Sequence, residues 1–401
     1  MVYVQEAEWR IDILGMNEKV LIFTSREICY NSHFFFAHQM GGAFEKLGYE
    51  VEYCEFTRES DFDAVLQPYL GQSYKMMLDF NSLMPQLAEE DGTPVLDMID
   101  GTFYDYILDH PLFHYNCLSA KAKNFHAILL DEAQEAYVKR YYPGVKSTMT
   151  MPLGATEAFT KDKGTAVPEC VLFMGSYDSE EKLYEMIELA PEPIKSLSKQ
   201  VLERRLAEPT DTMEAIFHEV LRERGMELDD ARFALFMNHM YPVDAYVRNH
   251  FRRKAIDCLV KYHIPVKIVG EGWEKYRSFD ENLVKREIPV EFGLSFEKIA
   301  KEHILLNNSP FFNHGAHDRI YAGMANHCAV LTDENPYLQR TLKDRENIML
   351  YSLKDEKNLK DMAEELLTNH GFCKDIQENA YREFVQKHTW EKRVEHLLEV
   401  I

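Results

Sequence analysis

The sequence predicts an α/β chain made of two doubly wound halves, each with a mostly parallel sheet. Short apolar runs alternate with longer segments of helical spacing, which is the pattern of strands joined by crossover helices. The chain has 401 residues, a length that corresponds to about two domains of ~100–200 residues each. Of these residues 46% are hydrophobic, which is enough to form their cores. The alternation stops at a polar stretch near the middle of the chain and then starts again. We therefore expect two domains with a ligand-binding cleft between them.

In the first half, apolar runs predict strands and the segments between most of them predict helices. The clearest helix covers 33–47, because Gly48 follows it where a helix C-terminus favours glycine. Segment 49–56 alternates in polarity, as a strand nearer a sheet edge does. The predicted strands of this half are 20–24, 49–56, 74–80, 94–99, 126–130 and a last run within 147–153.

A polar stretch at 160–168 without helical or strand period predicts a linker. We place an N-terminal domain at 1–158, a C-terminal domain at 159–380, and at 381–401 a C-terminal helix that packs back on the N-terminal domain. The remaining elements alternate as before, except for a helix-rich insertion. They are strands at 170–174, 265–269, 304–306 and 329–332, helices at 243–263 and 318–326, helices throughout 355–401, and the insertion at about 179–240.

The charge balance excludes some classes of partner. The chain carries 45 Lys and Arg against 67 Asp and Glu, a formal net charge of −22. Wrapping nucleic acid or lying on an anionic membrane requires basic surface, so both are disfavoured.

The cysteines indicate a reducing compartment. All seven are scattered without a C-x-x-C pair, which disfavours a disulfide framework or a cysteine-rich zinc site and favours small core side chains. No apolar run approaches the ~18 residues of a membrane span, and residues 1–10 lack the form of a signal peptide. We expect a cytoplasmic protein.

The most informative stretch is 307–337. It combines a polar, glycine-containing loop after a strand with a helix that begins near Asp318. The first N–H groups of a helix have no partner within it, and the helix dipole favours an anion there. Arg319 adds a planar donor suited to phosphate oxygens. The alternative is that Asp318 is an ordinary N-cap and Arg319 a surface cation.

Several short motifs occur in a characteristic order. They are Gly270-Glu-Gly-Trp273, Gly315-x-x-x-Arg319, Met324-Ala325, Leu331-Thr-Asp-Glu-Asn-Pro336 and His388-Thr-Trp-Glu-Lys-Arg393. With them the chain resembles the GT-B glycosyltransferases of the group-1 type, and most closely the branch typified by the spore-maturation protein CgeB. The resemblance is good over about 245–401. It is weaker in the N-terminal half, where Asp131, Tyr141-Tyr-Pro143 and Pro152-Leu-Gly154 follow the family's order.

The resemblance implies two Rossmann-like domains that transfer a sugar from a nucleotide-diphosphate sugar to an acceptor. The C-terminal half would hold the donor, and the N-terminal half a glycan, protein or small-molecule acceptor. Transfer would retain the anomeric configuration, without a metal or other cofactor. The catalytic residues would be Arg319, Arg253, His314 and Asp318. The donor-binding residues would be Gly175 and Ser176 at a strand end, Gly272 and Trp273 near the base, Gly315 at the diphosphate, and Asp333, Glu334 and Asn335 at the ribose.

The sequence departs from this family at one point. Retaining group-1 enzymes commonly carry a pair of glutamates, and aligning Met324-Ala325 places them at His314 and Ala322, neither of which is a carboxylate. Glu334 or another acid would then hold the ribose, or donor recognition differs. The departure favours one alternative, a nucleotide-sugar-binding protein without turnover. A sugar-nucleotide epimerase, which shares this architecture, is another.

Two possible metal motifs have simpler interpretations. Asp61-Phe-Asp63 resembles the Asp-x-Asp that binds a metal–diphosphate in other glycosyltransferases, but it begins a helical segment, where capping is the easier explanation. His314 and His317 could form half of a metal site, although no Glu lies between them.

Three further features have a structural and a functional interpretation. Trp273 is either a core aromatic or a platform for the base. The segment Arg252-Arg253-Lys254 is either a solvated face or turns one Arg inward, and the resemblance favours Arg253. The insertion is either a helical cap over apolar surface or a platform for an acceptor or partner.

Overall fold

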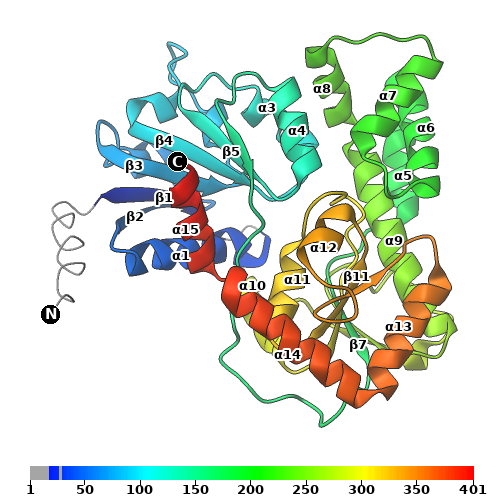
Figure 1. Ribbon diagram of the computed structural model, residues 1–401. Coiled ribbons are helices and arrows are strands. Elements are labelled where there is room, and N and C mark those ends of the chain that lie inside the picture. Colours follow the sequence, from blue (N-terminus) through cyan, green and yellow to red (C-terminus); the bar gives the residue numbers. More distant parts are fainter. Residues whose placement is uncertain (1–17, 27–28) are drawn as a thin grey trace, which may run out of the picture.

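The computed structural model describes residues 18–26 and 29–401. The expectation for residues 1–10 lies outside these ranges. Two α/β units, each with one parallel six-stranded sheet, lie side by side and are joined by a long connection (Figure 1). The two-domain α/β prediction is confirmed.

The N-terminal sheet has the order β2-β1-β3-β4-β5-β6, with every pair parallel. Its second strand lies at the edge, as the alternating pattern predicted. The strands are β1 (Lys19–Ser25), β2 (Glu50–Phe56), β3 (Ser73–Phe80), β4 (Asp100–Ile107), β5 (Phe125–Leu129) and β6 (Thr148–Thr150). The helices of this domain are α1 (Ser32–Lys46), α2 (Phe62–Leu66), α3 (Tyr115–Leu118) and α4 (Glu132–Tyr141).

The strand predicted at 94–99 is wrong. Val95–Met98 forms a 3-10 turn, and the strand is β4, which follows directly. Pro94 precedes the turn, and Val95 and Leu96 are buried as core residues rather than as members of a ladder. β4 starts with Asp100 and Gly101, two residue types that strands disfavour. The β-branched and aromatic residues that favour a strand come only after them.

The C-terminal sheet has the order β12-β11-β10-β7-β8-β9, again all parallel. The chain reverses its direction of winding between β7 and β10, the place where open α/β sheets bind ligands at the carboxyl ends of their strands. The strands are β7 (Val171–Met174), β8 (Val266–Val269), β9 (Val284–Glu287), β10 (Ile304–Leu306), β11 (Ala329–Asp333) and β12 (Met349–Tyr351). The sequence did not predict β9 and β12, which are the two short edge strands.

The helices after β7 include those that the sequence predicts, together with two that it does not predict. They are α5 (Glu180–Leu189), α6 (Ile194–Ala207), α7 (Met213–Glu223) and α8 (Asp230–His239) in the insertion, then α9 (Tyr241–Lys261), α10 (Phe292–Ala300), α11 (Asp318–Ala325), α12 (Pro336–Thr341), α13 (Glu356–Thr368), α14 (His370–Lys387) and α15 (Trp390–Val400). The two that the sequence does not predict are α10 and α12. No helix in the described ranges is both long and apolar enough to cross a membrane.

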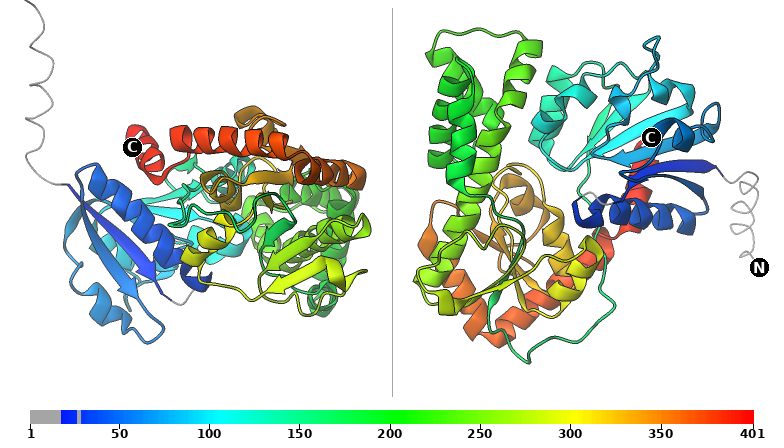
Figure 2. Two further views of the ribbon diagram at one scale, coloured as in Figure 1. Left: turned by 90° about the horizontal axis from the view of Figure 1, so that it is seen from below. Right: turned by 180° about the vertical axis from the view of Figure 1, so that it is seen from behind.

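The insertion reaches from the C-terminal domain to the N-terminal domain. Its last helix, α8, packs against α4, and the right-hand view in Figure 2 shows the insertion extending away from the sheet of the C-terminal domain. The ring of Tyr141 on α4 stacks on Phe233 of α8, with centroids 4.7 Å apart. The Tyr141 hydroxyl also contacts Glu214 at 2.9 Å and His218 at 2.7 Å. The helices therefore cover apolar surface, as the structural interpretation of this segment expected.

The C-terminal helix also returns to the N-terminal domain. Helix α15 packs along α1 (Figure 1). Trp390 is buried beside Phe36, and its Nε1 donates a hydrogen bond to the Thr156 hydroxyl at 3.1 Å. The two domains are thus linked by the connection after β6, by the insertion and by α15.

Candidate functional site

A cavity of about 310 Å³ lies between the two domains. From the C-terminal domain, the carboxyl end of β7 and the first residues of α11 line it. From the N-terminal domain, side chains of α1 and of the loop after β4 complete it. Its place is the one expected from the strand order, because the winding reverses between the neighbouring strands β7 and β10, and the cavity lies at the carboxyl end of β7.

Three arginines from two helices meet at this cavity: Arg248 and Arg252 from α9, and Arg319 from α11. The Arg252 Nη1 donates to the carbonyl oxygen of Ser176 at 2.7 Å, and the Arg319 Nη1 donates to the side-chain oxygen of Asn307 at 2.6 Å. The Nε atoms of Arg248 and Arg252 are buried and have no hydrogen-bond partner among the described residues.

The arginines disfavour one another's charge. Burial lowers the pKa of Arg252 well below its usual value, and the nearby positive charges of Arg248 and Arg319 lower it further. Burial also lowers the pKa of Arg319. Buried cations with unused donors are stabilised by an anion, so the cluster has the chemistry of a phosphate site.

The N-terminus of α11 faces the same cavity. Its N-cap is His317 and not Asp318, because the Nδ1 of His317 accepts the backbone N–H of Arg319 at 3.1 Å. Asp318 is the first helical residue, and both side chains line the cavity. The helix dipole adds positive potential beside the arginines.

Glycines bring the loops at the strand ends into close contact. A Cβ on Gly270 would lie 2.1 Å from the carbonyl oxygen of Gly175. Gly272 has a φ of +83°, and a Cβ there would lie 1.8 Å from the carbonyl oxygen of Tyr177. Larger residues would separate the loop after β7 from the loop after β8. Gly175 and Ser176 line the interdomain cavity.

A second cavity of about 500 Å³ adjoins the first and shares Ser176, Gly270 and Pro289 with it. Gly272 and Trp273 line this second cavity. Trp273 is nevertheless buried: its ring stacks on Tyr177 at 4.8 Å, and its Nε1 donates to the carbonyl oxygen of Gly175 at 2.7 Å. It therefore anchors the loop, as a core aromatic would.

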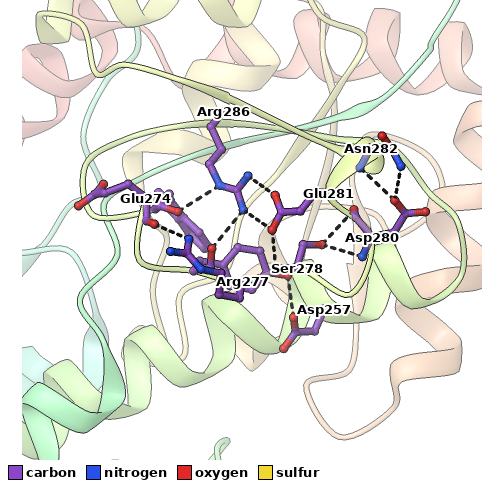
Figure 3. A network of polar contacts seen from close by, with 10 residues as sticks. Asp257, Glu274, Arg277, Ser278, Asp280, Glu281, Asn282 and Arg286 are labelled. Carbon is purple, nitrogen blue, oxygen red and sulfur yellow. Dashed lines mark hydrogen bonds and ion pairs between the residues drawn. The ribbon is translucent and has the colours of Figure 1, made fainter.

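The loop between β8 and β9 is held by its own polar network (Figure 3). Arg286 on β9 donates to the carbonyl oxygens of Trp273 at 3.1 Å and Tyr276 at 3.2 Å, and its Nη1 pairs with Glu281 at 2.6 Å. The Tyr276 hydroxyl donates to Asp257 on α9 at 2.7 Å. This network fixes one wall of the second cavity.

The structure places Arg253 outside both cavities, contrary to the inward orientation that the resemblance favoured. Its guanidinium makes two hydrogen bonds to Glu180, at 2.7 and 3.1 Å, and one to Asp257 at 2.8 Å. Arg252 is the arginine that turns inward. Arg248 and Arg252 are one turn apart on the same face of α9, so the two line the cavity together.

His314 and Gly315 lie at a contact between the domains. The backbone N–H of His314 donates to the Asp131 carboxylate at 2.6 Å, and a Cβ on Gly315 would lie 2.3 Å from the carbonyl oxygen of Leu130. Neither residue lines the interdomain cavity.

Two of the three residues expected at the ribose, Asp333 and Asn335, instead hold the loop between β10 and α11. Asp333 accepts the N–H of Ser309 at 2.9 Å, and burial raises the pKa of its carboxyl group to about 6. Glu334 accepts a hydrogen bond from Gln339 at 3.0 Å. Asn335 donates to the carbonyl oxygens of Phe312 at 2.9 Å and of Gly315 at 3.0 Å. None of these three side chains lines either cavity.

The other motifs have structural roles in the described ranges. Asp61 caps α2 by accepting the N–H groups of Asp63 at 3.1 Å and Ala64 at 3.3 Å. The six cysteines whose side chains are described are free, and five of them are buried. Among residues 18–26 and 29–401, no group of three or more His, Cys, Asp or Glu side chains is arranged to hold a metal ion.

Comparison with known families gives one match. Residues 248–399, which include all three cavity arginines, match a protein family described as "Glycosyl transferase-like". Solved structures match nearly the whole chain. The two Rossmann-like domains form a GT-B fold. A search of curated proteins finds no match.

The similar solved structures share little sequence with this GT-B chain. Sucrose-phosphate synthase from Thermosynechococcus elongatus is 12% identical, with a TM-score of 0.55 over 96% of this chain and 98% of that one. Anabaena HepE in complex with UDP-glucose is 11% identical, with a TM-score of 0.51 over 95% and 98%. TarM of S. aureus is 12% identical, with a TM-score of 0.48; the match covers 84% of this chain but only 57% of TarM. Identities this low show the shared fold alone.

Proposed function

We propose that the protein is a glycosyltransferase that moves a sugar from a nucleotide-diphosphate sugar to an acceptor. The observation that carries this proposal is the cluster of Arg248, Arg252 and Arg319 at the N-terminus of α11, with two buried Nε atoms lacking partners. The match of residues 248–399 to a glycosyl transferase-like family supports it, as does the fold shared with HepE, whose structure contains UDP-glucose. We therefore propose UDP as the nucleotide of the donor.

In this proposal the diphosphate lies against the arginines, and the nucleoside extends into the 500 Å³ cavity past Gly272 and Trp273. The bond from the anomeric carbon to the diphosphate oxygen breaks, and a bond from that carbon to the acceptor oxygen forms. The electron pair leaves with the nucleoside diphosphate, which also takes up the acceptor proton. Fixed positive charge stabilises the departing diphosphate, so we propose transfer without a metal. Retention of configuration is proposed from the family resemblance.

The test is release of nucleoside diphosphate from a panel of nucleotide sugars. Arg319→Ala should lower the rate by ~100–1,000-fold, the typical effect of removing one such electrostatic donor. Arg253→Ala is the matched control, because Arg253 pairs with Glu180 and Asp257 outside the cavity. Full activity of Arg319→Ala would reject the role assigned to that residue.

A binding protein without turnover is the second candidate. It is favoured by His314 and Ala322, which stand where the resemblance expects glutamates. Calorimetry that shows tight binding of a nucleotide sugar, with no hydrolysis and no transfer to any acceptor of a panel, would select it. The free cysteines in the described ranges lead us to propose a cytoplasmic location in either case.

A further inference from the structure

Apart from its arginines, the interdomain cavity is lined largely by apolar side chains. Phe36 comes from α1 of the N-terminal domain, while Phe292 and Phe296 come from α10 of the C-terminal domain. The rings of Phe36 and Phe292 are 4.8 Å apart. Phe311 and Phe312, 4.4 Å apart, precede α11 and complete an aromatic lining. Both domains thus contribute rings to one surface.

Among residues 18–26 and 29–158, the polar side chains that line the cavity are few: Tyr30, Ser32 and Asp109. Asp109 follows β4, and its Oδ2 accepts a hydrogen bond from Asn81 at 2.9 Å. The Asp109 carboxylate lines the cavity, and carboxylate oxygens can each accept more than one hydrogen bond, including one from a ligand. A hydrophilic oligosaccharide buries many hydroxyl groups, each of which needs a partner. This wall supplies too few side chains for that.

We propose that the acceptor in the sugar transfer proposed above is a compact aromatic alcohol. Its ring packs against Phe36, Phe292 and Phe296. Its hydroxyl group donates a hydrogen bond to Asp109 until transfer, when the proton passes to the departing diphosphate. Aromatic rings pack favourably edge-to-face or offset against one another, which suits a lining made of phenyl rings. The inference rests on the proposed function, since it names the acceptor class for the same site.

The experiment uses the full chain saturated with UDP and titrated in a calorimeter with 4-methylumbelliferone, a fused aromatic alcohol. We expect saturable binding that weakens at least about ten-fold in Phe292→Ala and in Asp109→Asn. Leu294→Ala is the matched control, because Leu294 lies on the same helix, is 54% exposed and does not line the cavity. Phe292→Leu, which keeps an apolar side chain at the domain contact, is the second variant should Phe292→Ala fail to fold.

Maltotriose serves as the hydrophilic probe, and we expect no binding of it. Binding of maltotriose without binding of 4-methylumbelliferone, or wild-type affinity in Phe292→Ala, overturns the inference. UDP affinity is measured in parallel and should be unchanged in Phe292→Ala. If nucleotide sugars bind and turn over while 4-methylumbelliferone does not bind, the acceptor inference alone fails. If no nucleotide sugar binds, the proposed function fails whatever the aromatic probe does.

Discussion

At the scale of single residues, two adjacent arginines have opposite environments. Arg252 lines the cavity with an unused Nε donor, whereas Arg253 is occupied by Glu180 and Asp257. Sequence could establish that one arginine of the pair turns inward, but not which, because the choice depends on the rotation of α9 relative to the sheet. Arg248 belongs to no motif, so the sequence alone does not indicate its role.

Replacing the two arginines in turn tests this assignment. Arg252→Ala should weaken UDP binding by about 10–100-fold, since a hydrogen bond to a charged group contributes about 1.5–3 kcal/mol. Arg253→Ala should leave UDP affinity nearly unchanged and lower only the thermal stability. Calorimetric titration with UDP measures the first effect and a melting curve the second. Equal losses of affinity in both variants would contradict the assignment.

Gly315 permits close contact between the domains. Gly315→Ala places a Cβ 2.3 Å from the carbonyl oxygen of Leu130, and we expect it to lower the free energy of unfolding by about 1–3 kcal/mol, as overpacking does. Gly42→Ala is the control: it lies within α1, nothing is within 4 Å of its Cβ, and it should gain about 0.5–1 kcal/mol. Urea unfolding compares the two.

The buried Asp79 predicts how stability depends on pH. Burial raises the pKa of its carboxyl group to about 7, despite hydrogen bonds from the Ser82 hydroxyl and the Phe80 N–H. Between an unfolded pKa of about 3.9 and this value the folded protein retains a proton that the unfolded chain has lost. Its contribution to stability is therefore full below about pH 4, and it is lost as the pH rises to about 7.

Asp79→Asn should flatten this decline, because the amide does not ionise and keeps an oxygen for the Phe80 N–H. Urea unfolding at about pH 5 and about pH 8 measures the difference in each variant. The exposed Asp162 gives the control, Asp162→Asn, which should keep the wild-type slope. An identical slope in Asp79→Asn and wild type would refute the prediction.

At the scale of elements, sequence periodicity was sufficient where a strand is buried on both faces. β1, β7 and β10 are such strands, and their apolar runs identify them. It failed at β9 and β12, short edge strands with little alternation, and at 94–99, where an apolar run belongs to a turn. The strand order depends on contacts distant in sequence and required the structure, as did the convergence of α9 and α11 on one cavity.

The insertion is the element whose position could not be predicted. Phe233 of α8 is 1% exposed and packs on Tyr141 of the other domain. Phe233→Ala should cost about 3–5 kcal/mol, as aromatic truncation in a core does, and should speed hydrogen exchange in both α8 and α4. Leu235→Ala, on the same helix but 37% exposed, should change stability by at most about 0.5 kcal/mol. Faster hydrogen exchange in α8 alone would show that the contact between α8 and α4 does not stabilise the N-terminal domain.

At the scale of the whole molecule, three links between the domains predict cooperative unfolding. Scanning calorimetry should show one transition, since the insertion shares a continuous core with the N-terminal domain and α15 covers α1. UDP at about 100 times its Kd should stabilise the fold by ~2.7 kcal/mol and move that transition as a unit. Two separate transitions, only one of them moved by UDP, would contradict this.

The net charge of −22 has its consequence at the same scale. A diphosphate is repelled by the molecule as a whole, so its binding depends on the local arrangement of Arg248, Arg252 and Arg319. The net charge and the helix that follows 307–317 predict that a local group of basic residues binds the diphosphate. They do not predict its members, because Arg248 and Arg252 lie far from Arg319 in the sequence.

The return of α15 to α1 also determines when folding can finish during synthesis. The apolar face of α1 includes Phe36 and Phe44, which belong to the same buried cluster as Trp390, Val394 and Leu397. A ribosome makes α1 well before α15, so the core of the N-terminal domain closes only after the C-terminal domain has been synthesised. A nascent chain halted before residue 390 therefore presents an open hydrophobic face of the kind that chaperones bind.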